Sequence, residues 1–437
     1  MFFKLLKDAF KVSEIRNRIL FTIFIIFVFR LGTHITVPGI NIHSLNALAD
    51  LPFLNMINLV SGNAMQNFSV FAMGVSPYIT ASIIVQLLQM DIVPTFVEWS
   101  KQGDVGRRKL NQATRYITLV LAMVQSIAIT AGFNAMSATG IVDTPDLSTY
   151  LMIGLLLTTG SMIVVWLGEQ ITDKGFGNGV SMIIFAGIVA SIPDAIKAVY
   201  EDKFVNIRHS ELTSSIIFVI ILLIAMGLIV LFTTYFTQAI LKIPIQYTKL
   251  VQGAPTSSYL PLRLNPAGVI PVIFASSITA VPATLLQLFR ATKGDAPWIE
   301  KLQAALSYDT WTGIFIYAFL IILFTFFYAF VQVNPEKMAE NLQKQGSYIP
   351  SVRPGKDTEK YISNILIRLS FVGSIFLGLI SIIPIISTDL FDLPKMVALG
   401  GTSLLIIITT SIEGIKQLQG YLLKRKYSGF MDEPVVD

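Results

Sequence analysis

Ten apolar stretches recur along the chain, and they constrain its fold more than any other feature. A helix needs roughly 20 mostly apolar residues to cross the hydrocarbon core of a bilayer. Stretches of this kind occupy residues 19–37, 69–90, 114–134, 149–168, 179–199, 213–234, 266–289, 311–333, 364–386 and 396–415. Charged residues make up only 14% of the chain, whereas a soluble domain carries about 25%. The sequence therefore predicts an all-α membrane protein with ten transmembrane helices.

Lysine and arginine are distributed unevenly between the connecting segments. If the N-terminus is cytoplasmic and the helices alternate, 24 of the 32 basic residues fall in cytoplasmic segments and 7 in outer segments, with Arg30 inside the first helix. Short cytoplasmic loops are enriched in lysine and arginine, so we expect both termini in the cytoplasm. No small-residue cleavage site follows the first apolar stretch, so we expect that helix to be retained and not removed as a signal peptide.

Ten helices divide into two groups of five. An odd number of helices per group places the groups in opposite orientations, which is the arrangement of an inverted repeat. A polar outer segment, residues 193–212, separates the fifth helix from the sixth. We therefore expect an N-terminal half at residues 1–205 and a C-terminal half at residues 206–437.

Residues 53–68 interrupt the helical pattern, because they are half polar, too short to span a membrane and too apolar for a free loop. Irregular backbone at membrane depth survives only where it is buried in protein or lines a wet cavity. This segment is therefore either a re-entrant half-helix that folds back into a central cavity or an amphipathic helix on the outer leaflet. Two long cytoplasmic loops, 235–265 and 332–363, are either solvated connectors or docking sites for a soluble partner.

Residues suited to catalysis or metal binding are scarce. The chain has no cysteine, and its three histidines are too scattered for a metal site. It lacks a Walker A loop, an H-E-x-x-H motif and a G-x-S-x-G motif. The glycine-rich segment from Gly175 to Gly179 lies at a membrane boundary without a preceding strand, so we expect a tight chain reversal there. The sequence thus predicts neither an enzyme nor a cofactor.

Ionisable residues inside the apolar stretches bear on a second alternative, a secondary transporter of a small solute. Coupled transporters usually carry such groups within the bilayer, where each is costly unless it is functional. Arg30 is the only clear case in the sequence, and Glu169 and Glu413 fall at cytoplasmic helix ends, where their side chains reach water. An apolar interior favours a path that coordinates no small-molecule substrate, and the transporter stays as the alternative.

A series of short motifs resembles the signatures of the SecY family, in the family's order and over residues 10–430. The motifs are Arg30-Leu-Gly32, Val37-Pro-Gly-Ile40, the run from Phe71 to Leu88, Gly106-Arg-Arg-Lys109, Trp166-Leu-Gly-Glu-Gln-Ile171, Gly177-Asn-Gly179, Phe185-Ala-Gly-Ile188, Asn265-Pro-Ala-Gly-Val-Ile-Pro271, Phe274-Ala-Ser-Ser277, Arg353-Pro-Gly355 and the run from Gly400 to Ile406. The resemblance implies a bacterial plasma-membrane channel with two inverted five-helix halves around a central pore. Such a channel passes unfolded secretory proteins across the membrane and inserts membrane proteins sideways into it.

The resemblance places a pore ring on six branched aliphatic side chains. A ring of apolar side chains repels water, so it blocks ions without a rigid steric barrier. It also offers no hydrogen bonds, so an extended polypeptide of any sequence can slide through it. The implied ring consists of Val75, Ile79, Val180, Ile184, Ile273 and Ile406.

A plug and a lateral gate are also implied by the resemblance. The plug fills the outer funnel at rest and corresponds to a half-helix at about residues 55–66. Its named members are Met56, Ile57, Leu59, Val60 and Gly62. The gate lies between the second and third helices on one side and the seventh and eighth on the other, and hydrogen bonds among polar side chains would hold it shut. Its polar positions are Thr80, Gln125 and Asn265.

The partners that the resemblance implies are proteins and lipids. SecE would brace the two halves, SecG would complete the complex, and the motor ATPase SecA or the ribosome would dock on the two long loops. Candidate contacts are Arg353, Lys249 and Lys356. Signal peptides and nascent or secretory polypeptides would be the cargo. The tip of the first loop, residues 246–255, is poorer in arginine than is usual in the family, so we expect weaker electrostatic docking there.

Overall fold

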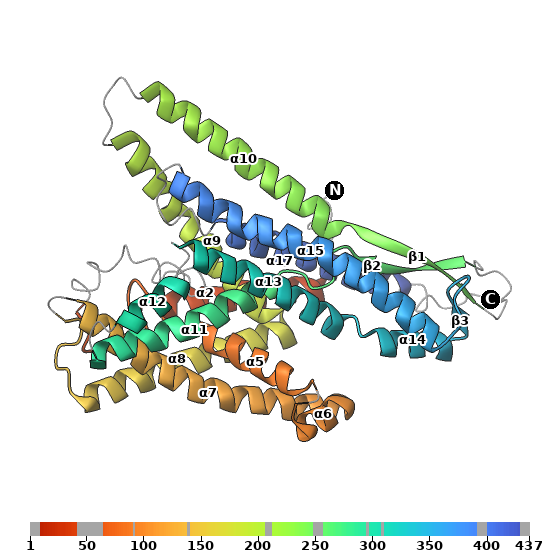
Figure 1. Ribbon diagram of the computed structural model, residues 1–437, viewed down its shortest axis with the longest axis horizontal. Coiled ribbons are helices and arrows are strands. Elements are labelled where there is room, and N and C mark those ends of the chain that lie inside the picture. Colours follow the sequence, from red (N-terminus) through yellow and green to blue (C-terminus); the bar gives the residue numbers. More distant parts are fainter. Residues whose placement is uncertain are drawn as a thin grey trace.

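The computed structural model describes residues 9–41, 64–90, 92–137, 140–205, 212–247, 257–293, 297–306, 310–390 and 400–428. Most of its long helices run side by side along the long axis of the molecule (Figure 1). A helix coincides with each of the ten predicted stretches. These helices are α2 (Ser13–Gly32), α5 (Ser76–Leu88), α7 (Gly103–Met136), α8 (Leu147–Lys174), α9 (Gly179–Tyr200), α10 (Leu212–Gln238), α11 (Ile270–Lys293), α13 (Trp311–Gln332), α15 (Lys356–Leu390) and α17 (Gly400–Ser428).

Four shorter helical elements lie between the long ones. The π-helix η1 continues α9, and α6 leads directly into α7. Their bounds are α6 (Pro94–Lys101), η1 (Glu201–Val205), α12 (Pro297–Leu306) and α14 (Pro335–Lys344).

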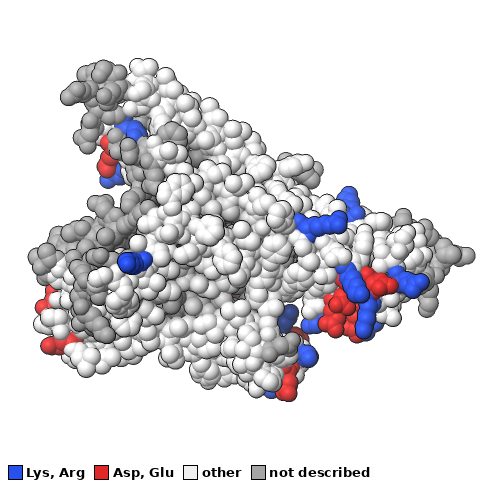
Figure 2. All heavy atoms as spheres, in the orientation of Figure 1, with Lys and Arg blue, Asp and Glu red and all other residues white. Residues whose placement is uncertain are grey.

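Six helical stretches in the described part of the chain are long and apolar enough to cross a membrane. They are Gly103–Ala135, Leu147–Lys174, Gly179–Val205, Leu212–Gln238, Trp311–Lys344 and Lys356–Ser387. Ser76–Leu88 and Ile270–Ala280 are apolar but shorter. Charged side chains gather toward the two ends of the long axis and leave a largely uncharged belt between them (Figure 2). The chain is therefore a multi-pass membrane protein, while a full set of ten crossings stays a prediction.

The second predicted helix begins later than its apolar stretch. We expected helix over residues 69–90, but residues 64–75 form a series of turns, and α5 begins at Ser76. Pro77 lies in the first turn of α5, where a proline is favoured because the missing N–H has no helical partner. The turns are nevertheless buried, since Met65 and Phe68 pack with Phe133 of α7 in one apolar cluster. That part of the prediction was wrong because hydropathy reports burial and not backbone conformation.

A small antiparallel sheet, absent from the all-α prediction, lies at one end of the molecule. Its strands are β1 (Ile240–Tyr247), β2 (Ser257–Arg263) and β3 (Ser347–Tyr348), in the order β2-β1-β3. The β1–β2 register runs from Ile240 opposite Arg263 to Gln246 opposite Ser257. The sheet joins the two long loops predicted from the sequence. An apolar cluster from the sheet, α14 and α15 then binds them into one unit, and its buried members are Ile243, Ile245, Leu262, Leu342, Ile349, Ile362 and Leu369.

The two halves touch along two seams. In the first, which we call the α7–α11 seam, α11 packs against both α7 and α5. In the second, which we call the α9–α17 seam, α9 packs against α17. The largest apolar cluster draws buried side chains from α5, α9, α11, α13, α15 and α17, so it connects the two seams. By contrast, α10 packs on α17 and η1 at the edge of the molecule and leaves most of its surface exposed (Figure 1).

Candidate functional site

The six predicted pore-ring side chains come from both halves of the chain. The start of α5 contributes Val75 and Ile79, the first turns of α9 contribute Val180 and Ile184, and α11 and α17 contribute Ile273 and Ile406. Four of them are buried members of the largest apolar cluster, and Val180 and Ile273 are half-buried and pack against it. The six side chains themselves carry no hydrogen-bonding atoms, although the wider cluster includes Tyr317 and Tyr328. The six aliphatic side chains are therefore suited to exclude water and unsuited to hold an ion or a polar solute.

Helix α8 fixes the turn that places Val75 at the start of α5. The hydroxyl of Ser161 donates a hydrogen bond to the carbonyl of Gly74 over 2.9 Å. One residue earlier, Gly160 lies so close to the turn that a Cβ there would stand 1.8 Å from the carbonyl oxygen of Val70. The position of Val75 therefore depends on small residues of α8.

The start of α9, and with it Val180, is fixed by the end of α8. The Asn178 side chain accepts a hydrogen bond from the N–H of Ser181 over 3.2 Å, which is the helix-capping role that asparagine favours. The Thr172 hydroxyl accepts one from the N–H of Gly179 over 2.9 Å. Residues 175–179 reverse the chain between α8 and α9, and Gly177 has a φ of +85° that other residues rarely adopt. The chain reversal expected at these glycines is present.

The three predicted gate residues lie on or beside the α7–α11 seam. Thr80 of α5 donates to the carbonyl of Ser76 over 3.2 Å, within its own helix. The Asn265 amide donates to the carbonyl of Gly268 over 2.8 Å, just before α11. Gln125 is buried in α7. The hydrogen bonds of Thr80 and Asn265 are therefore local, and a latch among the three residues stays a prediction.

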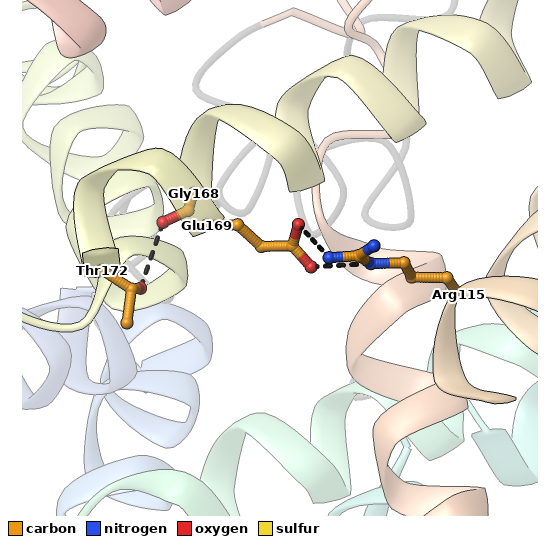
Figure 3. A network of polar contacts seen from close by, with 4 residues as sticks. All are labelled: Arg115, Gly168, Glu169 and Thr172. Atoms are coloured by element: carbon orange, nitrogen blue, oxygen red, sulfur yellow. Dashed lines mark hydrogen bonds and ion pairs between the residues drawn. The ribbon is translucent and has the colours of Figure 1, made fainter. Parts of the chain in front are cut away.

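A bidentate ion pair between α7 and α8 was missed by the sequence analysis. The Arg115 guanidinium donates to both carboxylate oxygens of Glu169, over 3.0 and 2.7 Å (Figure 3). The Arg115 side chain is 52% exposed and that of Glu169 27%. Sequence reasoning took Glu169 simply to reach water at a helix end. The partner lies 54 positions away, so no local spacing rule could have revealed it.

Two of the three predicted docking residues, Arg353 and Lys356, lie in the described part of the chain. Arg353 and Lys356 are exposed in and just after the turn that precedes α15. The Thr358 hydroxyl donates to the Arg353 carbonyl over 2.9 Å, and Gly355 has a φ of +97°, so this turn has a defined shape. Lys249 and the plug residues Met56, Ile57, Leu59, Val60 and Gly62 lie outside the described residues. Within the described ranges, no three His, Asp or Glu side chains group closely enough to hold a metal ion.

Comparison with known proteins relates the sequence to one family. The SecY family model matches residues 69–415. The protein translocase subunit SecY of Lactococcus lactis subsp. cremoris is 71% identical over 436 residues, covering 100% of this chain and 99% of the relative. That of Streptococcus gordonii is 71% identical over 432 residues, covering 99% of each. The Bacillus subtilis subunit is 49% identical over 435 residues, covering 98% of this chain and 99% of the relative.

Solved structures share the fold at low sequence identity. A structure described as that of a protein conducting channel has a TM-score of 0.66 at 17% identity and covers 96% of this chain and 95% of that chain. Sec61 in the canine ribosome–channel complex from the endoplasmic reticulum has a TM-score of 0.62 at 16% identity, with the same coverage. The resemblance seen in the sequence motifs is therefore confirmed, and the chain belongs to the SecY family, the protein-conducting channel subunits of protein translocases.

Proposed function

We propose that this channel carries unfolded secretory polypeptides outward through the six-residue pore ring and releases membrane helices sideways through the α7–α11 seam. It does so as a ten-helix protein of the bacterial plasma membrane, with both termini in the cytoplasm. The observation that carries the proposal is the convergence of the six aliphatic side chains, from four helices of both halves, on one apolar cluster.

The pore ring seals by repelling water. Branched aliphatic side chains leave no polar atoms for water to bind, so a narrow ring dewets and resists ions. An extended polypeptide displaces these side chains and takes their place as the seal. The ring needs no recognition of sequence, which suits a channel for many different secretory proteins.

The lateral exit depends on a balance between hydrophobic transfer and a polar latch. A leucine-rich signal helix gains roughly 0.5 kcal/mol per residue on entering lipid. A hydrogen bond within the membrane contributes about 1 kcal/mol or less. About ten apolar residues therefore outweigh a latch made by Thr80, Gln125 and Asn265, and hydrophobicity alone opens the gate.

Residues 55–66 would act as the plug of the closed channel. The family offers a precedent, since one related structure is described as showing that the plug domain of the SecY protein stabilises the closed state of the translocation channel. In this chain residues 64–68, which overlap the end of that segment, are anchored by burial of Met65 and Phe68. A plug that ends on this anchor could leave the funnel and return to it.

The unit made by the sheet and α14 is the proposed docking platform for SecA or the ribosome. A related Sec61 channel is described in a complex with the ribosome. The exposed basic side chains of Arg353 and Lys356, on a turn of defined shape, support an electrostatic contact in this chain. SecE and SecG would complete the complex in the membrane, in contact with its lipids.

Crosslinking of a stalled secretory chain tests the pore assignment. Single cysteines at Val75, Ile184 and Ile273 introduce the only thiols, because the chain has no cysteine of its own. We expect crosslinks from all three positions to the translocating chain. Cysteines at Ile220 and Leu223, which are exposed on α10, are the matched controls and should react little. Crosslinks at the controls alone would refute the pore assignment.

Polar substitutions in the ring separate a channel from a solute transporter. Ile79→Asn and Ile406→Asn should raise ion leakage and relax the requirement for a signal sequence, because a polar ring stays wet. Leakage is measured as conductance in planar bilayers. Loss of uptake of a small solute without any leak would favour a transporter instead.

A further inference from the structure

An apolar groove runs between α10 and α15. Four side chains of α10 and six of α15 line it, and all ten are leucine, isoleucine, valine or phenylalanine. The groove has a volume of about 430 Å³. Its floor belongs to the core, since Phe376 and Ile380 are buried members of the largest apolar cluster. Because all of the lining residues come from α10 and α15, this α10–α15 groove is separate from both seams and from the predicted pore ring.

Aromatic rings bring the two helices together at one end of the groove. The ring of Phe236 stacks on that of Phe376 with 3.8 Å between their centroids, and the Phe232 and Phe376 centroids lie 5.7 Å apart. Farther along, Leu228 of α10 and Leu379 of α15 are 61% and 55% exposed. Apolar side chains that face a gap lose dispersion contacts on that side. The packing of α10 against α15 is therefore incomplete in this chain alone.

The position and the size of the groove restrict what can fill it. Both helices belong to stretches that are long and apolar enough to cross a membrane, so the groove faces hydrocarbon. Water would find no polar side-chain partner among the lining residues. A helix about 10 Å across that followed the groove for roughly 16 Å would need on the order of 1,200 Å³, well above the volume of the groove. A single row of methylene groups, such as an acyl chain, fits.

A basic side chain stands at the end of the groove where α15 approaches the sheet. Four lining residues of α15 recur every three or four positions and so form one stripe: Val372, Ile375, Leu379 and Ile383. Arg368 is exposed and lies one turn before Val372 on the same stripe. Figure 2 shows an uncharged surface over α10 and α15, with basic side chains toward that end. A guanidinium matches the geometry of a phosphate group, and its long stem lets the charge reach the membrane surface.

We propose that the α10–α15 groove binds one acyl chain of a membrane phospholipid, whose phosphate group contacts the Arg368 guanidinium. The bound chain supplies the apolar contacts that α10 and α15 lack between them. The lipid thereby steadies α10, the helix from which the hairpin of β1 and β2 continues after Ala239. The site lies away from the proposed path of the polypeptide, so the inference goes beyond the proposed function and does not depend on the ring or the gate.

Filling the groove tests the acyl-chain site. The full chain, purified with its accompanying subunits in detergent, is titrated with palmitoyl-oleoyl phosphatidylcholine, and bound lipid is counted by native mass spectrometry. This lipid has no net charge, so its binding does not report general attraction to a basic surface. The double variant Ile375→Trp, Leu379→Trp should weaken binding of one lipid roughly tenfold or more, because the indoles take the place of the chain. Leu223→Trp, at an exposed position of α10 outside the groove, should bind as the unaltered protein does.

Equal affinity in the double variant and in Leu223→Trp overturns the site. Loss of an accompanying subunit from the double variant, with lipid binding unchanged, would mean that a partner helix covers the groove, and this overturns it too. A bound species with the mass of a free fatty acid would overturn the assignment to a phospholipid. None of these readouts requires translocation, so they stand or fall apart from the proposed function.

Substitution of Arg368 tests the phosphate contact and leaves the groove itself intact. Arg368→Gln should raise the Kd for the same lipid roughly fivefold, the weight of one partly exposed charge pair. Arg368→Lys keeps the charge and should lose less. Lys337→Gln removes an exposed charge from α14 and should leave the Kd unchanged. If Arg368→Gln binds as Lys337→Gln does, the phosphate contact is wrong, and this comparison decides the matter even if the double variant fails to fold.

Discussion

The two seams between the halves are held together in different ways. On the α7–α11 seam, buried hydroxyls satisfy themselves locally: those of Thr80, Thr118 and Thr279 each donate to a carbonyl four residues back in their own helix. On the α9–α17 side, backbone N–H groups of the 175–179 loop depend on side chains of α2 and α17. Local hydrogen bonds survive when two helices part, whereas bonds between elements do not.

This difference supports the proposal that the channel opens at the α7–α11 seam. A seam made by packing loses only contacts, and a hydrophobic segment that enters it restores them. Parting the α9–α17 seam would break the hydrogen bond from the Gly177 N–H to Gln417 and leave that donor unpaired, at a cost of about 1–3 kcal/mol. We therefore expect the α7–α11 seam to be the one that opens repeatedly, and the four predictions below test this contrast.

The largest expected effect comes from locking the seams covalently. One cysteine at Gln125, combined in turn with single cysteines over residues 270–280 of α11, allows a short bis-maleimide to bridge the α7–α11 seam. We expect the bridge to abolish translocation, because the gate cannot part. Bridges between residues 186–192 of α9 and 403–412 of α17 should leave translocation intact. Equal inhibition by both sets, measured as protected precursor in vesicles, would remove the contrast between the seams.

A single methyl group at the start of α9 should have the next largest effect. A Cβ on Gly179 would stand 1.7 Å from the carbonyl oxygen of Gly168, a backbone atom that cannot swing away. Gly179→Ala should therefore destabilise the protein by about 3 kcal/mol through overpacking. Thermal unfolding in detergent provides the measurement. Gly227→Ala in α10 is the control, since a Cβ there meets open space and should cost nothing.

Breaking the ion pair between α7 and α8 should have a smaller effect. Glu169→Gln removes the carboxylate that the Arg115 fork binds, and we expect a loss of about 1 kcal/mol because the pair is partly exposed. A double-mutant cycle with Arg115→Gln isolates the interaction. No coupling between the two substitutions would mean that α7 is not tied to α8 through this pair.

The smallest effect is expected far from both seams. Lys344 and Glu340 of α14 lie 2.7 Å apart on an exposed helix surface, where an ion pair adds little. Glu340→Gln should leave the unfolding midpoint and the resting leak unchanged. A clear change in the ion leak would mean that the unit made by the sheet and α14 is coupled to the pore. The contrast between the seams predicts no such coupling.

Hydropathy predicted the positions of the long helices but missed the non-helical segments, namely the turns before α5 and the small sheet. A helix overlaps each of the ten apolar stretches, although α5 covers only Ser76–Leu88 of the second one. The turns before α5 escaped notice because they are as apolar as the helix that follows. The sheet escaped because β1 shows only a brief alternation, with Ile243 and Ile245 buried on either side of Pro244.

At the candidate site, the family motifs predicted individual residues that hydrophobic periodicity could not. No periodicity distinguishes Ile406 from other isoleucines in membrane helices, and only the ordered motifs singled out the six ring positions. The loop at residues 175–179, which bonds to Thr22 and Gln417, shows what the sequence could not predict. Its glycines predicted a chain reversal, but Thr22 and Gln417 are ordinary polar residues in sequence and acquire a role only when the fold brings them to one loop.

The hairpin of β1 and β2 connects α10 to α11 by a short path. Leu264 donates to the carbonyl of Ala239 over 2.9 Å, which closes the hairpin where α10 ends. Only residues 264–269 then separate β2 from the first turn of α11. A load carried by the two strands would therefore reach one wall of the α7–α11 seam through six residues.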